Sequence, residues 1–115
     1  MTLTDVKIEI DAFNERTAND VALQRDLLSC FESEFSVLCN SLNHTALNHD
    51  CQAVASDLHK LKGSVGIFGF VNVVERISEL ENMLKTDFRA DFTEKLSELF
   101  LSVEKHIVEL KKCIY

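Results

Sequence analysis

Hydrophobic residues recur along most of this chain at intervals of three and four positions, the spacing that lines one face of an α-helix. Four such stripes follow one another and predict bundle helices over approximately 20–42, 47–67, 70–85 and 88–113. The stripes consist of Leu27, Leu28, Phe31, Phe35, Leu38 and Leu42; Cys51, Val54, Leu58, Leu61, Val65 and Phe68; Val73, Val74, Ile77, Leu80 and Leu84; and Phe92, Leu96, Leu99, Val103, Ile107, Leu110 and Ile114.

Short polar segments separate the stripes. Residues 43–49 lack the helical period and are interpreted as a connection, and the polar run 85–87 makes a second break. Asn19 or Asp20 is a suitable N-cap for the first long helix, and Asp50 is one for the next. Because amphipathic helices with short connections each need to bury one face, the predicted fold is all-α, an antiparallel four-helix bundle.

A short amphipathic stretch lies ahead of the bundle, with Val6, Ile8, Ile10 and Phe13 as its apolar positions. It fits a lead-in helix or an extended arm, and we expect a short N-terminal lead-in helix. The chain has no proline and three glycines, as long helices require. Its 115 residues are expected to form a single domain over residues 1–115.

The formal net charge of −7 argues against a nucleic-acid partner, since proteins that bind nucleic acid normally present a basic face. No stretch approaches the roughly 20 apolar residues that span a bilayer, and no secretory signal is apparent. We therefore expect no membrane partner, a cytoplasmic location and reduced cysteines. Cys30, Cys51 and Cys113 are expected to pack as small hydrophobic residues.

His59 lies about 100° around its helix from Leu58, a member of the hydrophobic stripe, and therefore points outward. Residues three, four and seven positions away share its strip of surface, and most of them are small. The members of this strip are Gln52, Ala55, Ser56, Lys62, Gly63 and Gly66.

The strip suits phosphoryl chemistry. A neutral imidazole is a nucleophile near pH 7, because its reference pKa is about 6.5. Lys62, one turn away from His59, can place an ammonium charge beside phosphoryl oxygens. Gly63 has no side chain and lets a partner approach the ring, although glycine inside a helix costs about 1 kcal/mol relative to alanine.

The run HKLKGSVGIFG, residues 59–69, resembles the signature of the histidine-phosphotransfer (Hpt) domains of bacterial multistep phosphorelays. The resemblance extends over most of the chain and includes the Leu-Glu pair at 80–81. One departure is the bulky pair at 67–68, where small residues are common, and we expect Phe68 to point inward. The matching signature positions are His59, Lys62, Gly63 and Gly69.

This resemblance implies a four-helix bundle in which His59 is the phosphoacceptor and Lys62 is the electrostatic partner of the phosphoryl group. Docking is expected over Ala55, Ser56, Gly63 and Gly66. The resemblance implies no kinase activity and no cofactor of the chain's own, because the magnesium ion and the acid–base chemistry belong to the partner. The implied partners are receiver domains of a hybrid sensor kinase or of a response regulator.

The alternative is a helical adaptor that binds a signalling partner through the same face without being phosphorylated. No metal site is expected, since His44 and His49 are interpreted as solvated loop residues and their spacing matches no zinc pattern. His106 is expected at the surface. We also expect a monomer, and the initial methionine favours a free-standing protein over a domain excised from a larger kinase.

Overall fold

The computed structural model describes residues 6–86 and 91–115, and these residues are almost entirely helical. The predicted all-α class is therefore confirmed. The helices within the described ranges are α1 (Ile10–Arg16), α2 (Val21–Leu47), α3 (Cys51–Ile67), α4 (Val71–Thr86) and α5 (Asp91–Ile114).

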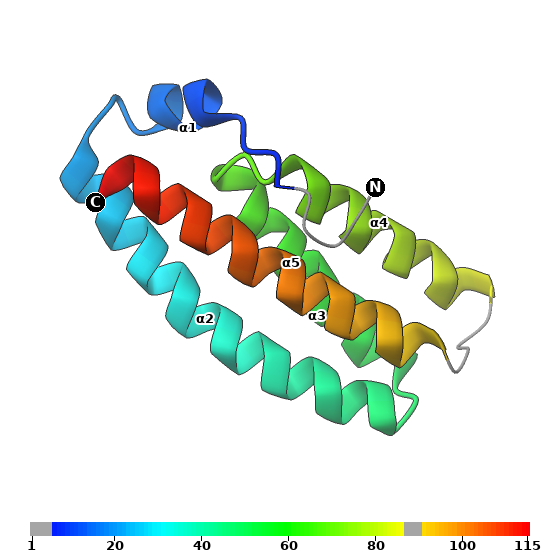
Figure 1. Ribbon diagram of the computed structural model, residues 1–115. Helices are drawn as coiled ribbons and strands as arrows, with labels where there is room; N and C mark the ends of the chain where they lie inside the picture. The colour runs from blue at the N-terminus through cyan, green and yellow to red at the C-terminus, as the bar shows by residue number, and fades with distance from the viewer. Residues whose placement is uncertain (1–5, 87–90) are drawn as a thin grey trace.

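The four long helices lie side by side, and each contacts two others (Figure 1). Helix α2 packs against α3 and α5, and α4 packs against the same two helices. Consecutive long helices run in opposite directions in Figure 1. The predicted stripes supply most of the core between them, and α5 buries all seven of its predicted stripe residues.

Two predicted helix boundaries were wrong. Helix α2 continues to Leu47, through most of the segment interpreted as a connection, because Ala46 is buried one turn after buried Leu42 and extends the apolar face. The third helix consequently begins at Cys51 rather than at residue 47, and Asp50 caps it by accepting a 3.1 Å hydrogen bond from the Ala53 N–H. The predicted start of the last helix, residue 88, lies outside the described residues.

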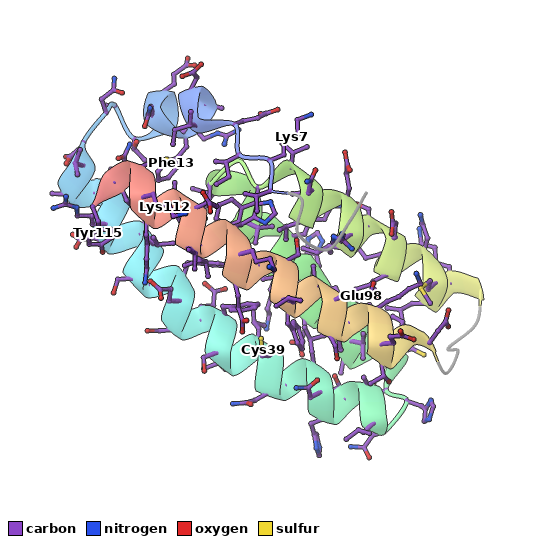
Figure 2. All side chains as sticks on the ribbon, viewed as in Figure 1. Lys7, Phe13, Cys39, Glu98, Lys112 and Tyr115 are labelled. Atoms are coloured by element: carbon purple, nitrogen blue, oxygen red, sulfur yellow. The ribbon has the colours of Figure 1, made fainter. Side chains whose placement is uncertain are left out.

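The N-terminal stretch contains both of the forms considered for it. Residues 6–9 are extended, and Ile8 forms an isolated antiparallel bridge with Phe70 in the turn between α3 and α4. The Glu9 N–H donates to the Gly69 carbonyl at 2.9 Å. Helix α1 then crosses the end of the bundle, and its fully buried Phe13 packs against the ring of Phe68 (Figure 2).

The cysteines differ from the prediction. Cys30, Cys51 and Cys113 are exposed, whereas Cys39, for which no packing was predicted, is half-buried. Cys30 follows buried Leu28 by two positions, and this step of about 200° around the helix turns the thiol away from the core face. All four cysteines are free thiols.

Within the described ranges, none of the helices combines the length and the apolar character needed to cross a membrane.

Candidate functional site

Helix α3 presents His59 to solvent because its opposite face is anchored in the core. Leu58 and Leu61 are fully buried on either side of His59 in sequence, and His59 itself is exposed. Over residues 6–86 and 91–115, the His59 ring forms no hydrogen bond or ion pair. The predicted outward orientation is therefore what the structure shows, and the ring is accessible to a molecule that approaches α3 from outside.

Two hydrogen bonds join α3 to α2, one before His59 and one after it. The Ser41 hydroxyl donates to Oδ2 of the nearly buried Asp57 at 2.6 Å, two residues before His59. The Ser64 hydroxyl donates to Oε1 of Glu34 at 3.1 Å, five residues after it. These contacts bracket His59 along the helix and hold its strip away from α2.

An ion pair joins α3 to α4 near His59. The Lys62 ammonium lies 3.1 Å from Oε1 of Glu81, and both side chains are partly exposed. Lys62 was predicted from the sequence, but Glu81 was not assigned a role. The two residues are 19 positions apart on different helices, so no local spacing connects them. Lys62 is thus held one turn from His59 by a carboxylate that competes with any other anion for its charge.

Gly63 and Gly66 face open space. A Cβ atom added to either glycine would meet no other heavy atom within 4 Å, apart from the helix's own backbone nearby. Packing among the described residues therefore gives no reason for glycine at these two helical positions, even though each costs about 1 kcal/mol relative to alanine. The open space lies on the outside of the helix, about one turn after His59 at Gly63 and about two turns after it at Gly66.

The predicted strip is brought together on one accessible face. Gln52, Ala55 and Ser56 are exposed before His59, and Gly63 is exposed after it. Lys62 and Gly66 are partly exposed. The result is an exposed imidazole on α3, with the Lys62 cation one turn away on the same strip and small residues over much of the rest of the strip.

The C-terminus of α3 is capped by Arg16, a residue to which the sequence analysis gave no role. The Arg16 guanidinium donates to the carbonyls of Gly66 and Ile67 at 3.0 and 3.1 Å. A cation at this position satisfies the last carbonyls of the helix and complements its dipole. Phe68 follows and is buried, as predicted, so it does not occupy the strip.

His106 is not at the surface, and that prediction was wrong. Its side chain projects from α5 and is fully buried against the Phe70 ring and the N-terminal segment. A histidine directly after Lys105 has the local sequence of a surface position, but it lies one turn before buried Leu110 and three residues after buried Val103. Both flanking residues belong to the α5 stripe, and this spacing is the signal that would have placed His106 inside.

His44 and His49 are exposed, although His44 lies on α2 rather than in a loop. Across the described residues, no group of three or more His, Cys, Asp or Glu side chains is arranged to hold a metal ion.

The family model described as "Hpt domain" matches residues 26–113, which is most of the chain. No curated protein and no solved structure gives a significant match. Members of the matched family act as phosphocarrier modules in phosphorelays, together with receiver domains. The chain belongs to the Hpt domain family.

Proposed function

We propose that this protein accepts a phosphoryl group on His59 from the aspartyl phosphate of one receiver domain and passes it to another. The observation that supports this most directly is the exposed ring of His59, which has no hydrogen-bond partner among the described residues. It shares its strip with two glycines, Gly63 and Gly66, whose added Cβ atoms would meet open space. A nucleophile that must meet two partner active sites in turn needs to be both held in position and accessible.

The transfer is an exchange of one phosphorus bond for another. A lone pair on an imidazole nitrogen of His59 attacks phosphorus and forms the N–P bond, while the bond from phosphorus to the aspartate oxygen breaks and frees that carboxylate. The second ring nitrogen carries the proton of the neutral imidazole. The reverse reaction on another receiver domain returns the imidazole, so the carrier is unchanged after each cycle.

Lys62 acts in this proposal as the electrostatic partner of the phosphoryl group. It is one turn from His59, and its ammonium needs only to exchange the Glu81 carboxylate for phosphoryl oxygens. We assign no further catalytic group among the described residues. The magnesium ion and the acid–base chemistry belong to the receiver domain, and the carrier has neither a cofactor nor kinase activity of its own.

The receiver domain docks on the strip around His59, over Ala55, Ser56, Gly63 and Gly66. The long helices serve as the antiparallel four-helix bundle typical of this family, a rigid support for one accessible ring. We further propose that the protein works as a monomer in the cytoplasm, where its partners are the receiver domains of a hybrid sensor kinase or a response regulator.

Phosphoryl transfer from a charged receiver domain tests the proposal. Receiver domains are first phosphorylated with labelled acetyl phosphate or by their kinase. They are then mixed with the wild type and, separately, with His59→Gln. We expect label on the wild type only, and the label should be lost in acid and stable in alkali, as a phosphohistidine is. Circular dichroism of both proteins checks that the variant is still helical.

A folded wild type that takes label from none of several receiver domains would contradict the proposal. The helical adaptor would then account for the same surface. In that case His59→Gln should bind the signalling partner as well as the wild type does, because binding alone does not need an imidazole.

A further inference from the structure

The N-terminal segment, residues 6–9, is attached to three other parts of the molecule and lies outside the region matched by the family model. Its Glu9 N–H donates to the Gly69 carbonyl at 2.9 Å, and its Lys7 carbonyl accepts from the Val71 N–H at 3.2 Å. The third attachment is to α5, where the Lys7 N–H meets Nε2 of His106 at 3.3 Å. Figure 2 shows Lys7 close to the start of α4.

Hydrogen-bond geometry fixes the protonation of the His106 ring. Nδ1 lies 2.7 Å from the Ser102 carbonyl oxygen, which can only accept, so Nδ1 carries a proton. The Lys7 N–H can only donate, so Nε2 must offer a lone pair. An imidazole that donates through one nitrogen and accepts through the other is neutral. The imidazolium form would instead direct an Nε2–H at the Lys7 N–H.

We propose that His106 is a proton-sensitive latch that holds the N-terminal segment on α5 while its ring is neutral and releases the segment when the ring is protonated. Release begins at Lys7, which loses its acceptor, and then loosens the pairing of residues 7–9 with the turn between α3 and α4. Glu9 and Gly66 both line a small apolar hollow there, so its wall opens as Glu9 moves away.

The surroundings of the ring favour the neutral form. His106 is fully buried, and the Phe70 ring lies against it at 5.1 Å between centroids. Helix α4 contributes the cationic Arg76, and the N-terminal segment contributes the exposed side chain of Lys7. On α5 itself, Lys105 adjoins His106, and Glu109 lies one turn further on, where it pairs with Lys112 at 2.9 Å. The N-terminal segment also carries the exposed Glu9. The charge that acts on the titration of the ring is the Arg76 cation, which disfavours an imidazolium.

The pKa of His106 is lowered from 6.5, first by burial and also by the Arg76 cation, while the hydrogen bond to Ser102 acts in the opposite direction. The unfolded chain therefore takes up the proton at a higher pH than the folded protein does. The stabilisation from the neutral ring is complete above about pH 6.5 and is lost as the pH falls from there through the lowered pKa. Acid, rather than alkali, releases the latch.

The test is an NMR titration of the full chain from about pH 7.5 to about pH 4, a range that spans the ordinary histidine pKa, with amide hydrogen-exchange protection measured alongside. At high pH the His106 ring should show the tautomer with the proton on Nδ1. As that ring takes up its second proton, the Lys7 and Glu9 amides should lose protection roughly tenfold, a loss typical of one hydrogen bond. The Leu99 amide, inside α5, should keep its protection over the same range.

His106→Gln is the matched variant, because glutamine offers a donor and an acceptor and does not titrate. Its Lys7 amide should show no acid transition, whereas His59→Gln should retain the wild-type transition. Three results would overturn the proposal. The neutral His106 ring could carry its proton on Nε2 at high pH, or the N-terminal segment could stay attached after the ring is protonated. The third is a loss of Leu99 protection at the same pH as the loss at Lys7 and Glu9. If His106→Gln does not fold, the wild-type titration still decides. No phosphoryl transfer is measured, so this result is independent of the proposed function.

Discussion

The ammonium of Lys62 lies 3.1 Å from the carboxylate of Glu81, across the contact between α3 and α4. This pair neutralises the cation nearest in sequence to His59 on its strip. A phosphoryl group on His59 would therefore compete with Glu81 for Lys62. In the proposed function, the Glu81 carboxylate would set how much of the attraction of Lys62 is available to phosphorylated His59.

Replacing Glu81 with glutamine should favour phosphorylation of His59. Lys62 would then lose its fixed anion and turn toward the phosphoryl oxygens. Partly exposed ion pairs stabilise a protein by up to about 1 kcal/mol. We therefore expect the equilibrium of transfer from a phosphorylated receiver domain to shift toward this protein by roughly two- to fivefold. The measurement is the fraction of label on each protein at equilibrium.

Glu32→Gln is the control for this experiment. Glu32 pairs with Lys111 at 3.2 Å, which is again a lysine–glutamate pair between two helices. Its loss should leave the transfer equilibrium unchanged. Equal shifts in both variants would attribute the effect to net charge and would contradict the specific competition for Lys62.

The hydrogen bond between Ser41 and Asp57 predicts a stability effect. Ser41→Ala leaves the Asp57 carboxylate, which is 9% exposed, without its 2.6 Å donor. Loss of a partner by a buried polar group costs about 1–3 kcal/mol, and that decrease is expected in the free energy of unfolding measured with urea. Ser36→Ala, at an exposed position of the same helix, should change it by less than about 0.5 kcal/mol. Equal stabilities for the two variants would show that Asp57 finds another partner.

The thiols should differ in reactivity. Burial, and to a smaller extent the Glu104 carboxylate, raises the pKa of the Cys39 thiol to about 11. Only the thiolate reacts with iodoacetamide, so Cys39 at about pH 8 should be labelled at least roughly tenfold more slowly than exposed Cys30, Cys51 and Cys113. Its rate should keep rising as the pH is raised further toward that pKa. Peptide mass spectrometry resolves the sites, and equal labelling of Cys39 and Cys30 would contradict this prediction.

The helical fold and the exposed strip could be predicted because both depend on local periodicity. The position of Leu58 and Leu61 in a stripe determines which way His59 points, whatever α3 packs against. The stripe also placed Phe68 in the core. The end of α2 was missed because Ala46 is a small residue and a weak hydrophobic signal, although it is 4% exposed.

The contacts that surround the strip were not predictable from spacing. Glu81 reaches Lys62 from another helix, and Arg16 reaches the end of α3 from 50 positions away. Such pairs depend on how the helices are placed in three dimensions. The burial of His106 could have been predicted from its spacing to Val103 and Leu110, but its hydrogen bond with the Lys7 N–H, 99 positions away, could not.

Gly63 and Gly69 should respond in opposite ways to the same substitution. Gly63→Ala enters open space within a helix and should raise the free energy of unfolding by up to about 1 kcal/mol. Gly69 has a φ of +72°, and a Cβ there would lie 2.8 Å from the Glu9 carbonyl oxygen. Gly69→Ala should therefore lower the free energy of unfolding by about 1–2 kcal/mol or more. Urea unfolding of both variants measures these changes.

Phosphoryl transfer should separate the role of Gly63 from its effect on stability. Gly63→Leu adds bulk one turn from His59, on the face proposed for docking of a receiver domain. We therefore expect the rate of transfer to fall at least roughly tenfold, a loss of about 1.4 kcal/mol in the transition state. Leu101→Phe adds bulk at an exposed position of α5 and should leave the rate unchanged. A stable Gly63→Leu variant that transfers at the wild-type rate would mean that the receiver domain does not approach over Gly63. The cost of a glycine inside α3 would then need another explanation.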